Sequence, residues 1–217
     1  VNDNAPAITS NGGGVTASVW IAENTTAATT VTAADADLPA QTLTYTISGG
    51  ADAAKFAINN STGVLTFAVA PNFEVPTDAN SDNVYDVTVQ VSDGTLTGTQ
   101  ALSVTVGDAN DAPVLDGSKT PVLSVQTEDS GAPSGAAGTL VASLVDFAAP
   151  AGQVDNVSDE DGGALAGIAV TSADTARGSW WYSTDNGSSW NALGAVTNGS
   201  ARLLAADAGT RLYFQPN

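Results

Sequence analysis

The sequence predicts an all-β fold made of two β-sandwich domains in tandem. Apolar and polar residues alternate along several segments, as they do in strands that bury one face. Helical spacing of apolar residues is rare, since the many alanines are interleaved with Thr, Ser, Val and Gly. A proline motif at Pro6 recurs at Pro113, 107 residues later, which is the length of one sandwich domain.

The strands of the first half are predicted by period-two alternation. Leu43, Tyr45 and Ile47 share one face, and threonines occupy the other face. Two later segments alternate in the same way, with apolar residues at Tyr85, Val87, Val89 and Val91, and then at Leu102, Val104 and Val106. Short strands separated by turns of Asn, Asp, Gly and Pro are typical of an antiparallel β-sandwich.

The repeated proline motif predicts the domain boundaries. Asn2-Asp3-Asn4-Ala5-Pro6 recurs as Asn110-Asp111-Ala112-Pro113. We therefore expect a linker remnant over 1–6, a sandwich over 7–107, a linker over 108–113 and a second sandwich over 114–217. No closing copy of the motif follows Tyr213, so the second sandwich is expected to be truncated at its C-terminus.

Composition excludes several classes of function. The chain has no Cys and no His, which rules out thiol nucleophiles, Ser-His-Asp triads, zinc fingers and disulfides. It carries 23 acidic and 5 basic residues, a formal charge of -18, which disfavours nucleic acid and anionic membrane surfaces. No apolar run near 18 residues is present, so membrane insertion is not expected. Hard cations with oxygen ligands are the partners that remain.

The acidic residues gather at turns, and the same groups recur in both halves. The recurring groups are Glu23-Asn24 with Glu128-Asp129, and Asp35-Ala36-Asp37 with Asp159-Glu160-Asp161. Asp and Asn favour turns by bonding local backbone, which explains single sites but not the repetition. Two carboxylates about 4 Å apart repel by roughly 4 kcal/mol at an effective dielectric near 20. A cation is therefore expected, and Ca²⁺ suits six to eight flexible oxygen ligands better than Mg²⁺.

The motifs occur in an order that resembles the calcium signature of cadherin repeats, in the version found in large bacterial surface adhesins of the RTX type. The motifs are Ala22-Glu23-Asn24, Asp35-Ala36-Asp37, Phe73-Glu74, Ser92-Asp93-Gly94 and Asp108-Ala109-Asn110-Asp111-Ala112-Pro113. The resemblance implies tandem Greek-key (cadherin/Ig-like) β-sandwiches joined by a calcium-binding linker.

The resemblance also implies two sets of calcium ligands. The junction between the two halves would use Glu23, Glu74, Asp108, Asn110, Asp111, Asp159 and Asp161. An N-terminal junction would use Asn2, Asp3, Asn4, Asp35, Asp37 and Asp93. Asp52 matches no motif, so its replacement is expected to loosen the junction less than that of Asp111.

A third site is indicated by the loop that contains Asp78, Asn80 and Asp82. Its D-x-N-x-D spacing matches the first ligands of an EF-hand loop, but no Glu follows at position twelve. A peripheral calcium site and a plain Asx-rich turn are the two interpretations.

The second half holds the densest aromatic segment. Ser183 to Trp190 resembles an Asp-box hairpin, in which Asp185 would bond the turn amides and Trp190 would pack beneath them. A sugar could stack on exposed rings, and the candidates are Trp180, Trp181, Tyr182 and Trp190. Alternation sends Trp180 and Tyr182 to one face and Trp181 to the other, so at least one ring is expected in the core.

These observations predict a non-enzymatic extender module of a bacterial extracellular adhesin, stiffened by calcium and active in cell adhesion and biofilm attachment at the cell surface. Calcium ions and neighbouring domains of the parent chain are the expected partners, together with a weak dimer through an exposed edge of the second half. The alternative is a carbohydrate-binding module that uses the Trp-rich hairpin.

Overall fold

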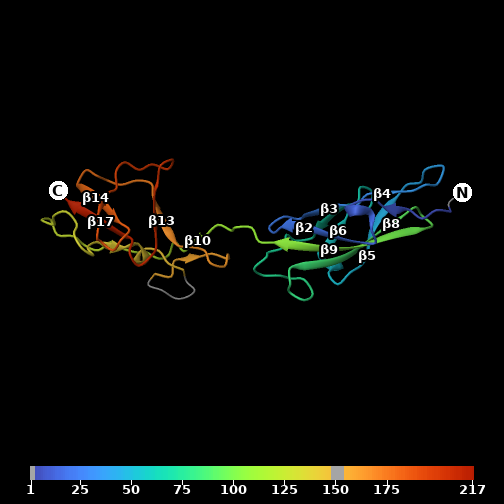
Figure 1. Cartoon of the computed structure of the whole chain (residues 1–217), viewed down its shortest axis with the longest axis horizontal. Helices are drawn as coiled ribbons and strands as arrows, with labels where there is room; N and C mark the ends of the chain where they lie inside the picture. Colours follow the sequence, from blue (N-terminus) through green and yellow to red (C-terminus); the bar gives the residue numbers. More distant parts are fainter. Residues whose placement is uncertain (1–2, 148–153) are drawn as a thin grey trace. The chain divides into compact units, whose positions relative to one another are not determined.

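The computed structural model describes residues 3–147 and 154–217. The chain divides into two compact units, Val1–Asn110 and Asp111–Asn217, and each is described by itself. Strands are the main regular secondary structure of both units (Figure 1), so the predicted all-β class is confirmed. Within the described residues, no helix has the length and hydrophobicity needed to cross a membrane.

The first unit contains a four-stranded and a three-stranded sheet. The larger sheet has the order β2-β9-β8-β5, with bounds Thr16–Ala22, Thr97–Gly107, Val84–Ser92 and Thr44–Gly49. The smaller sheet has the order β3-β7-β6, with bounds Ala27–Thr30, Val64–Phe67 and Phe56–Ile58. The pair β1 (Ala7–Ile8) and β4 (Ala33–Ala34) and the 3-10 turns η1 (Asn11–Gly13) and η2 (Ala53–Lys55) complete the unit.

The core of the first unit lies on the faces that the alternation predicts. On β8, Tyr85, Val89 and Val91 are completely buried, while Asp86 points to solvent. Leu102, Val104 and Val106 of β9 are also buried and belong to the same cluster. The rings of Phe56 and Phe67 on the smaller sheet pack against Tyr85, with Phe67 edge-on at 5.0 Å between ring centroids.

One strand pairing differs from the predicted antiparallel sandwich. β2 runs parallel to β9, from Thr16 opposite Ala101 to Ala22 opposite Gly107. Strands joined by a short hairpin must be antiparallel, but most of the unit separates β2 from β9 and leaves their relative direction free. This parallel register brings the C-terminal ends of both strands, and the acidic residues that follow them, to the same end of the sheet.

The second unit contains shorter strands. A four-stranded sheet has the order β11-β17-β14-β15, with bounds Thr139–Leu140, Arg211–Pro216, Gly178–Ser183 and Asn191–Ala192. Two strand pairs are separate from it, β13 (Gly167–Val170) with β16 (Arg202–Ala205), and β10 (Val114–Leu115) with β12 (Val157–Ser158). The 3-10 turn η3 (Val141–Ser143) follows β11.

The core of the second unit is smaller than that of the first. Its buried cluster consists of Val141, Val145, Val157, Leu204 and Leu212. Trp180 and Tyr182 of β14 pack against this cluster, which agrees with the expectation that at least one ring of the aromatic segment lies in the core.

Candidate metal sites

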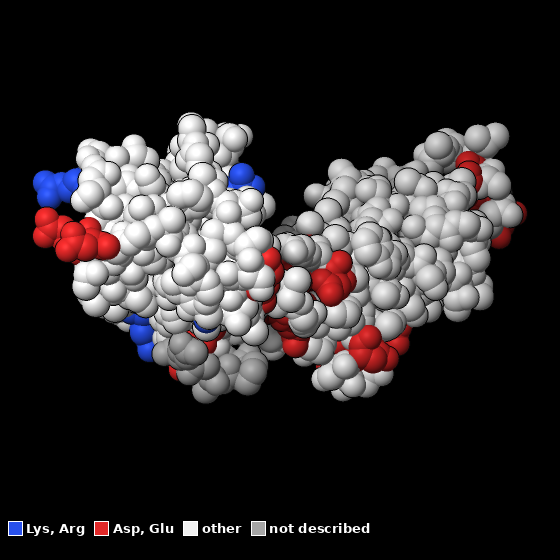
Figure 2. Space-filling view, turned by 60° about the vertical axis from the view of Figure 1, so that its left-hand side comes forward, with Lys and Arg blue, Asp and Glu red and all other residues white. Residues whose placement is uncertain are grey.

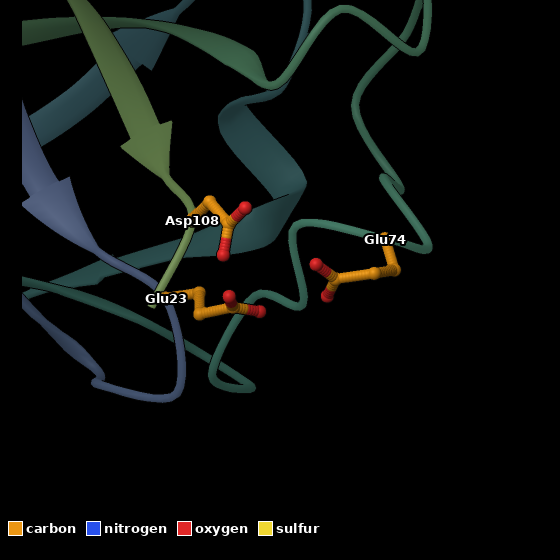
Figure 3. A group of neighbouring side chains, drawn as sticks. All are labelled: Glu23, Glu74 and Asp108. Carbon is orange, nitrogen blue, oxygen red and sulfur yellow. The ribbon is translucent and has the colours of Figure 1, made fainter. Parts of the chain in front are cut away.

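Three carboxylates of the first unit converge at one end of its larger sheet. Glu23 follows β2, Asp108 follows β9, and Glu74 lies in the long loop before β8. Each offers a carboxylate oxygen within 4.8 Å of those of the other two. Figure 3 shows the three side chains directed toward a common space. The sequence predicted all three as ligands of one junction.

Glu23 is held rigidly because its side chain connects three segments. It is 1% exposed, and its Oε2 accepts a hydrogen bond from the Phe73 amide at 2.7 Å. Its Oε1 accepts one from the Ala109 amide at 2.9 Å, beside Asp108. Buried carboxylates need such donors. Glu23 therefore orders the Glu74 loop and the Asp108 segment around itself.

The electrostatics of this cluster favour a bound cation. Two charges 4.8 Å apart repel by roughly 3–4 kcal/mol at an effective dielectric near 20. Lys55 is the only basic residue of the first unit. Acidic side chains are visible on both units in Figure 2, whereas the basic ones in view lie on the second unit. A hard cation would replace the repulsion with attraction.

A second cluster of the first unit contains Asp35, Asp37 and Asp93. Their carboxylate oxygens also lie within 4.8 Å of one another. Asp37 is 4% exposed, and its Oδ2 accepts hydrogen bonds from the amides of Asp3 and Asn4 at 3.1 Å. The Asn4 side chain donates to Asp37 Oδ1 at 2.6 Å, and this bond is the largest influence that lowers the pKa of Asp37.

The second cluster also contains a carboxylate oxygen that is suited to bind a metal. Asp35 Oδ2 is buried and accepts no hydrogen bond. A buried carboxylate oxygen without a donor is unfavourable unless a cation neutralises it. Asp93 contributes rigidity, since its Oδ1 accepts the amides of Thr95 and Leu96 at 2.7 Å. Asn2, another predicted ligand, lies outside the described residues.

The predicted ligands of the second unit form a local network. The Asp111 amide donates to Asp161 Oδ2 at 2.7 Å, and the Asp161 amide donates to Asp159 Oδ1 at 3.0 Å. Asp111 of the linker motif is thus bonded to the acidic triplet 50 residues later. Asn110 is the last residue of the first unit.

The loop of Asp78, Asn80 and Asp82 has the hydrogen bonds of an Asx-rich turn. Asp78 is 7% exposed and accepts the amides of Asn80, Asp82 and Asn83, each at 3.1 Å. These amides lower the pKa of Asp78 against the opposing effect of burial, which is the largest single influence. The Asn80 side chain donates to Asp82 Oδ2 at 2.8 Å. A calcium site here stays a prediction.

The aromatic hairpin of the second unit uses several ring faces internally. Trp180 packs on Phe214 with 4.8 Å between ring centroids, and Trp190 packs on Tyr213 at 5.9 Å. Arg202 covers the Tyr182 ring at 4.8 Å. The Trp181 side chain donates to Gln215 at 3.2 Å. A carbohydrate platform on these rings stays a prediction that their geometry does not favour.

The Asp-box prediction for the hairpin agrees with its hydrogen bonds. Asp185 Oδ1 accepts the Ser189 amide at 2.8 Å, and its Oδ2 accepts the Ser189 hydroxyl at 2.6 Å. The Ser183 hydroxyl donates to Asp185 Oδ1 at 2.8 Å and accepts from the Gly187 amide at 2.8 Å. These contacts close the turn.

Asp52 is the residue whose importance the sequence did not indicate. It is 4% exposed, its Oδ1 accepts the Ala79 amide at 2.7 Å and its Oδ2 accepts the Asp86 amide at 2.9 Å. Asp52 thereby holds the Asp78 loop against β8, and the expectation that its replacement loosens the junction less than that of Asp111 stays a prediction. Since its partners lie 27 and 34 residues away, no local motif marks it.

Comparisons with known proteins place the first unit in a class. Residues 17–107 match the family model described as the cadherin domain. A comparison with curated proteins finds no match. Human protocadherin-24 EC1-2 is 30% identical over 58% of this chain and 57% of that chain, with a TM-score of 0.41. This chain therefore spans a little over half of that fragment.

Other solved structures have lower sequence identity to this chain. A second crystal form of human protocadherin-24 EC1-2 is 18% identical over 99% of this chain and 100% of that chain, with a TM-score of 0.45. Drosophila N-cadherin EC1-3 is 19% identical over 50% of this chain and 35% of that chain, with a TM-score of 0.38. The family match covers residues 17–107, less than half of the chain, and cadherin domains as a class are adhesion-type extracellular modules that are generally non-enzymatic and generally bind calcium.

Proposed function

We propose that the chain is an extender module of a bacterial extracellular adhesin, and that calcium stiffens it. It would serve cell adhesion and biofilm attachment by projecting other domains from the cell surface, without enzymatic activity. The observation that carries this proposal is the pair of three-carboxylate clusters in a unit that holds one basic residue. Both clusters consist of residues from the cadherin-like motifs.

Residues of both units would hold the ions. Glu23, Glu74 and Asp108 would act with Asn110, Asp111, Asp159 and Asp161, and the second cluster would act with Asn2, Asp3 and Asn4. Bound calcium would supply positive charge and accept six to eight oxygens with flexible geometry. The chain's own part is to hold the carboxylates in place, as Glu23 does through two backbone amides.

Thermal unfolding of the whole chain with calcium or with excess chelator tests the proposal. If the dissociation constant is near 0.1 mM, about 1 mM calcium stabilises the folded chain by about 1.4 kcal/mol. For a unit of this size, that corresponds to a rise in melting temperature of about 5–10 °C. Magnesium should have a smaller effect, because it prefers rigid octahedral geometry. Small-angle scattering should show a change of particle length with calcium.

Charge-neutralising variants distinguish the proposed calcium ligands from other acidic residues. Glu23→Gln and Asp108→Asn should each weaken calcium binding at least tenfold in isothermal titration. Asp86→Asn is the matched control, because Asp86 is exposed and belongs to neither cluster. Its affinity should stay within twofold of the wild type. Equal melting temperature and particle length with calcium and with chelator would overturn the proposal.

A further inference from the structure

The second unit contains two segments that lack a strand partner on at least one side. The segment 121–126 forms no ladder with the rest of the described chain, although the Ser124 amide donates to Thr139 Oγ1 at 2.7 Å, and its Val122 and Val125 are 79% and 96% exposed. Strand β13 pairs only with β16 among the described strands, so its other edge is open. Open edges and exposed β-branched residues are features that strand addition removes.

In the first unit, a β-hairpin lies between the two strands that correspond to these segments. There, β2 directly precedes Glu23, β5 begins seven residues after Asp37, and the hairpin β8–β9 lies between β2 and β5 in the sheet. In the second unit, 121–126 precedes Glu128, and β13 begins six residues after Asp161. The motifs therefore equate 121–126 with β2 and β13 with β5.

A hollow of about 470 Å³ is lined by residues of both segments. Its wall includes Pro121 at the start of the open segment and Ile168 of β13. Most of its other large lining residues are apolar, namely Leu115, Leu144, Val145, Phe147, Val157 and Leu165. Its charged lining residues are Asp116 and Lys119, one of each sign, in a chain whose formal charge is -18. The hollow thus complements an apolar, uncharged face.

We propose that the second unit binds a β-hairpin, donated by a partner segment, between 121–126 and the open edge of β13. The hairpin resembles β8–β9, with apolar residues at alternate positions on the face that enters the hollow. Its main chain would extend the ladder from β13, and its apolar face would cover Leu165, which is 95% exposed. This inference does not depend on calcium binding.

A synthetic peptide of Val84–Gly107, the 24 residues of the chain's own hairpin with its turn, is the probe. Added to the whole chain, it should slow hydrogen exchange at least threefold in 121–126 and 167–170, read by mass spectrometry. A control peptide with Val87, Val89 and Val104 replaced by Thr keeps the main chain but has a weakened apolar face. It should give clearly less slowing than the wild-type peptide.

Two exposed sites outside the buried core allow variants that leave the fold intact. Leu165→Asp lies in the hollow and should weaken peptide binding at least tenfold. Leu203→Asp is the matched control, since Leu203 is 76% exposed on β16 and does not line the hollow. Equal effects of the two variants would overturn the proposal, as would unchanged exchange with the peptide. If 121–126 and 167–170 become protected without peptide as the chain concentration rises, a second copy of the chain is the occupant. That result would overturn the proposal of a donated hairpin.

Discussion

At the scale of single residues, buried carboxylates organise the first unit by collecting backbone amides from distant segments. Glu23 accepts amides that lie 50 and 86 residues away, and Asp52 accepts two others. Each carboxylate fixes a loop that carries further acids. The acidic clusters thus depend on two kinds of side chain. Some hold loops in place through hydrogen bonds, and others face the proposed ions.

Replacement of Asp52 should destabilise the first unit. Asp52→Ala leaves the amides of Ala79 and Asp86 without their acceptor, so we expect a loss of about 2–4 kcal/mol in the free energy of unfolding. Urea unfolding followed by tryptophan fluorescence measures it. Asp86→Asn, at an exposed side chain, is the control and should change stability by less than about 1 kcal/mol. A loss below that value for Asp52→Ala would show that other donors or water replace the bonds.

Asp185 should titrate at unusually low pH. The Ser189 hydroxyl is the first cause, followed by the Ser189 amide and the Ser183 hydroxyl, and together they lower the pKa of Asp185 to about 2. A pKa lowered in the folded state adds stability above the unfolded value near 4, and that stability is lost as pH falls from about 4 through 2.

The titration of the Asp185 carboxyl carbon by NMR checks this prediction. Ser189→Ala removes the largest cause, so the pKa of Asp185 should rise. Ser188→Ala is the matched control, because the Ser188 hydroxyl donates to the Asp185 main-chain oxygen and not to its carboxylate. If both variants titrate like the wild type, the Ser189 hydroxyl does not control this pKa.

At the scale of elements, the end of β5 requires glycine for two separate reasons. Gly50 has a φ of +107°, and a Cβ there would lie 2.3 Å from the main-chain oxygen of Asp86 on β8. Gly94, in the turn between β8 and β9, has a similar φ of +101°, but a Cβ there would meet nothing within 4 Å. Alanine at Gly94 therefore tests backbone strain alone, whereas alanine at Gly50 tests strain together with steric overlap.

Alanine at these glycines should therefore have unequal effects. Gly94→Ala should cost about 1–2 kcal/mol, the strain of a left-handed backbone with a side chain. Gly50→Ala should cost more by at least about 1 kcal/mol, because β5 must also move away from β8. Chemical denaturation of both variants measures the difference. Equal losses would mean that the sheet accommodates the methyl group freely.

At the scale of the whole molecule, the two units have cores of unequal size. Among the described residues, the buried apolar cluster contains 14 residues in the first unit and 5 in the second. Because stability grows with buried apolar area, the second unit should unfold at the lower temperature. Calorimetry of the whole chain should show two transitions.

Variants assign the two transitions. Leu204→Ala removes part of the small cluster and should lower only the first transition, whereas Val89→Ala should lower only the second. A loss of about 2–4 kcal/mol is expected for Leu204→Ala. A single transition that both variants shift equally would show that the units unfold as one.

The sequence by itself determined three strands of the first unit, β5, β8 and β9, and the residue types of its sites. Alternation identified the buried faces of β8 and β9, because a strand that buries one face must alternate. Motif order identified Glu23, Glu74 and Asp108 as one group and Asp35, Asp37 and Asp93 as another. Patterns of this kind are local, or are carried by a resemblance to a known family.

Only the tertiary structure decided the features that depend on distant residues. The parallel register of β2 and β9, the two amides held by Asp52, and the open edge of β13 all involve segments that are far apart in the chain or lack a partner. A local pattern fixes which face of a strand is apolar, but chain folding fixes which strand or amide meets it. The physical reason is that buried polar groups and strand edges are satisfied by whatever the fold brings near them.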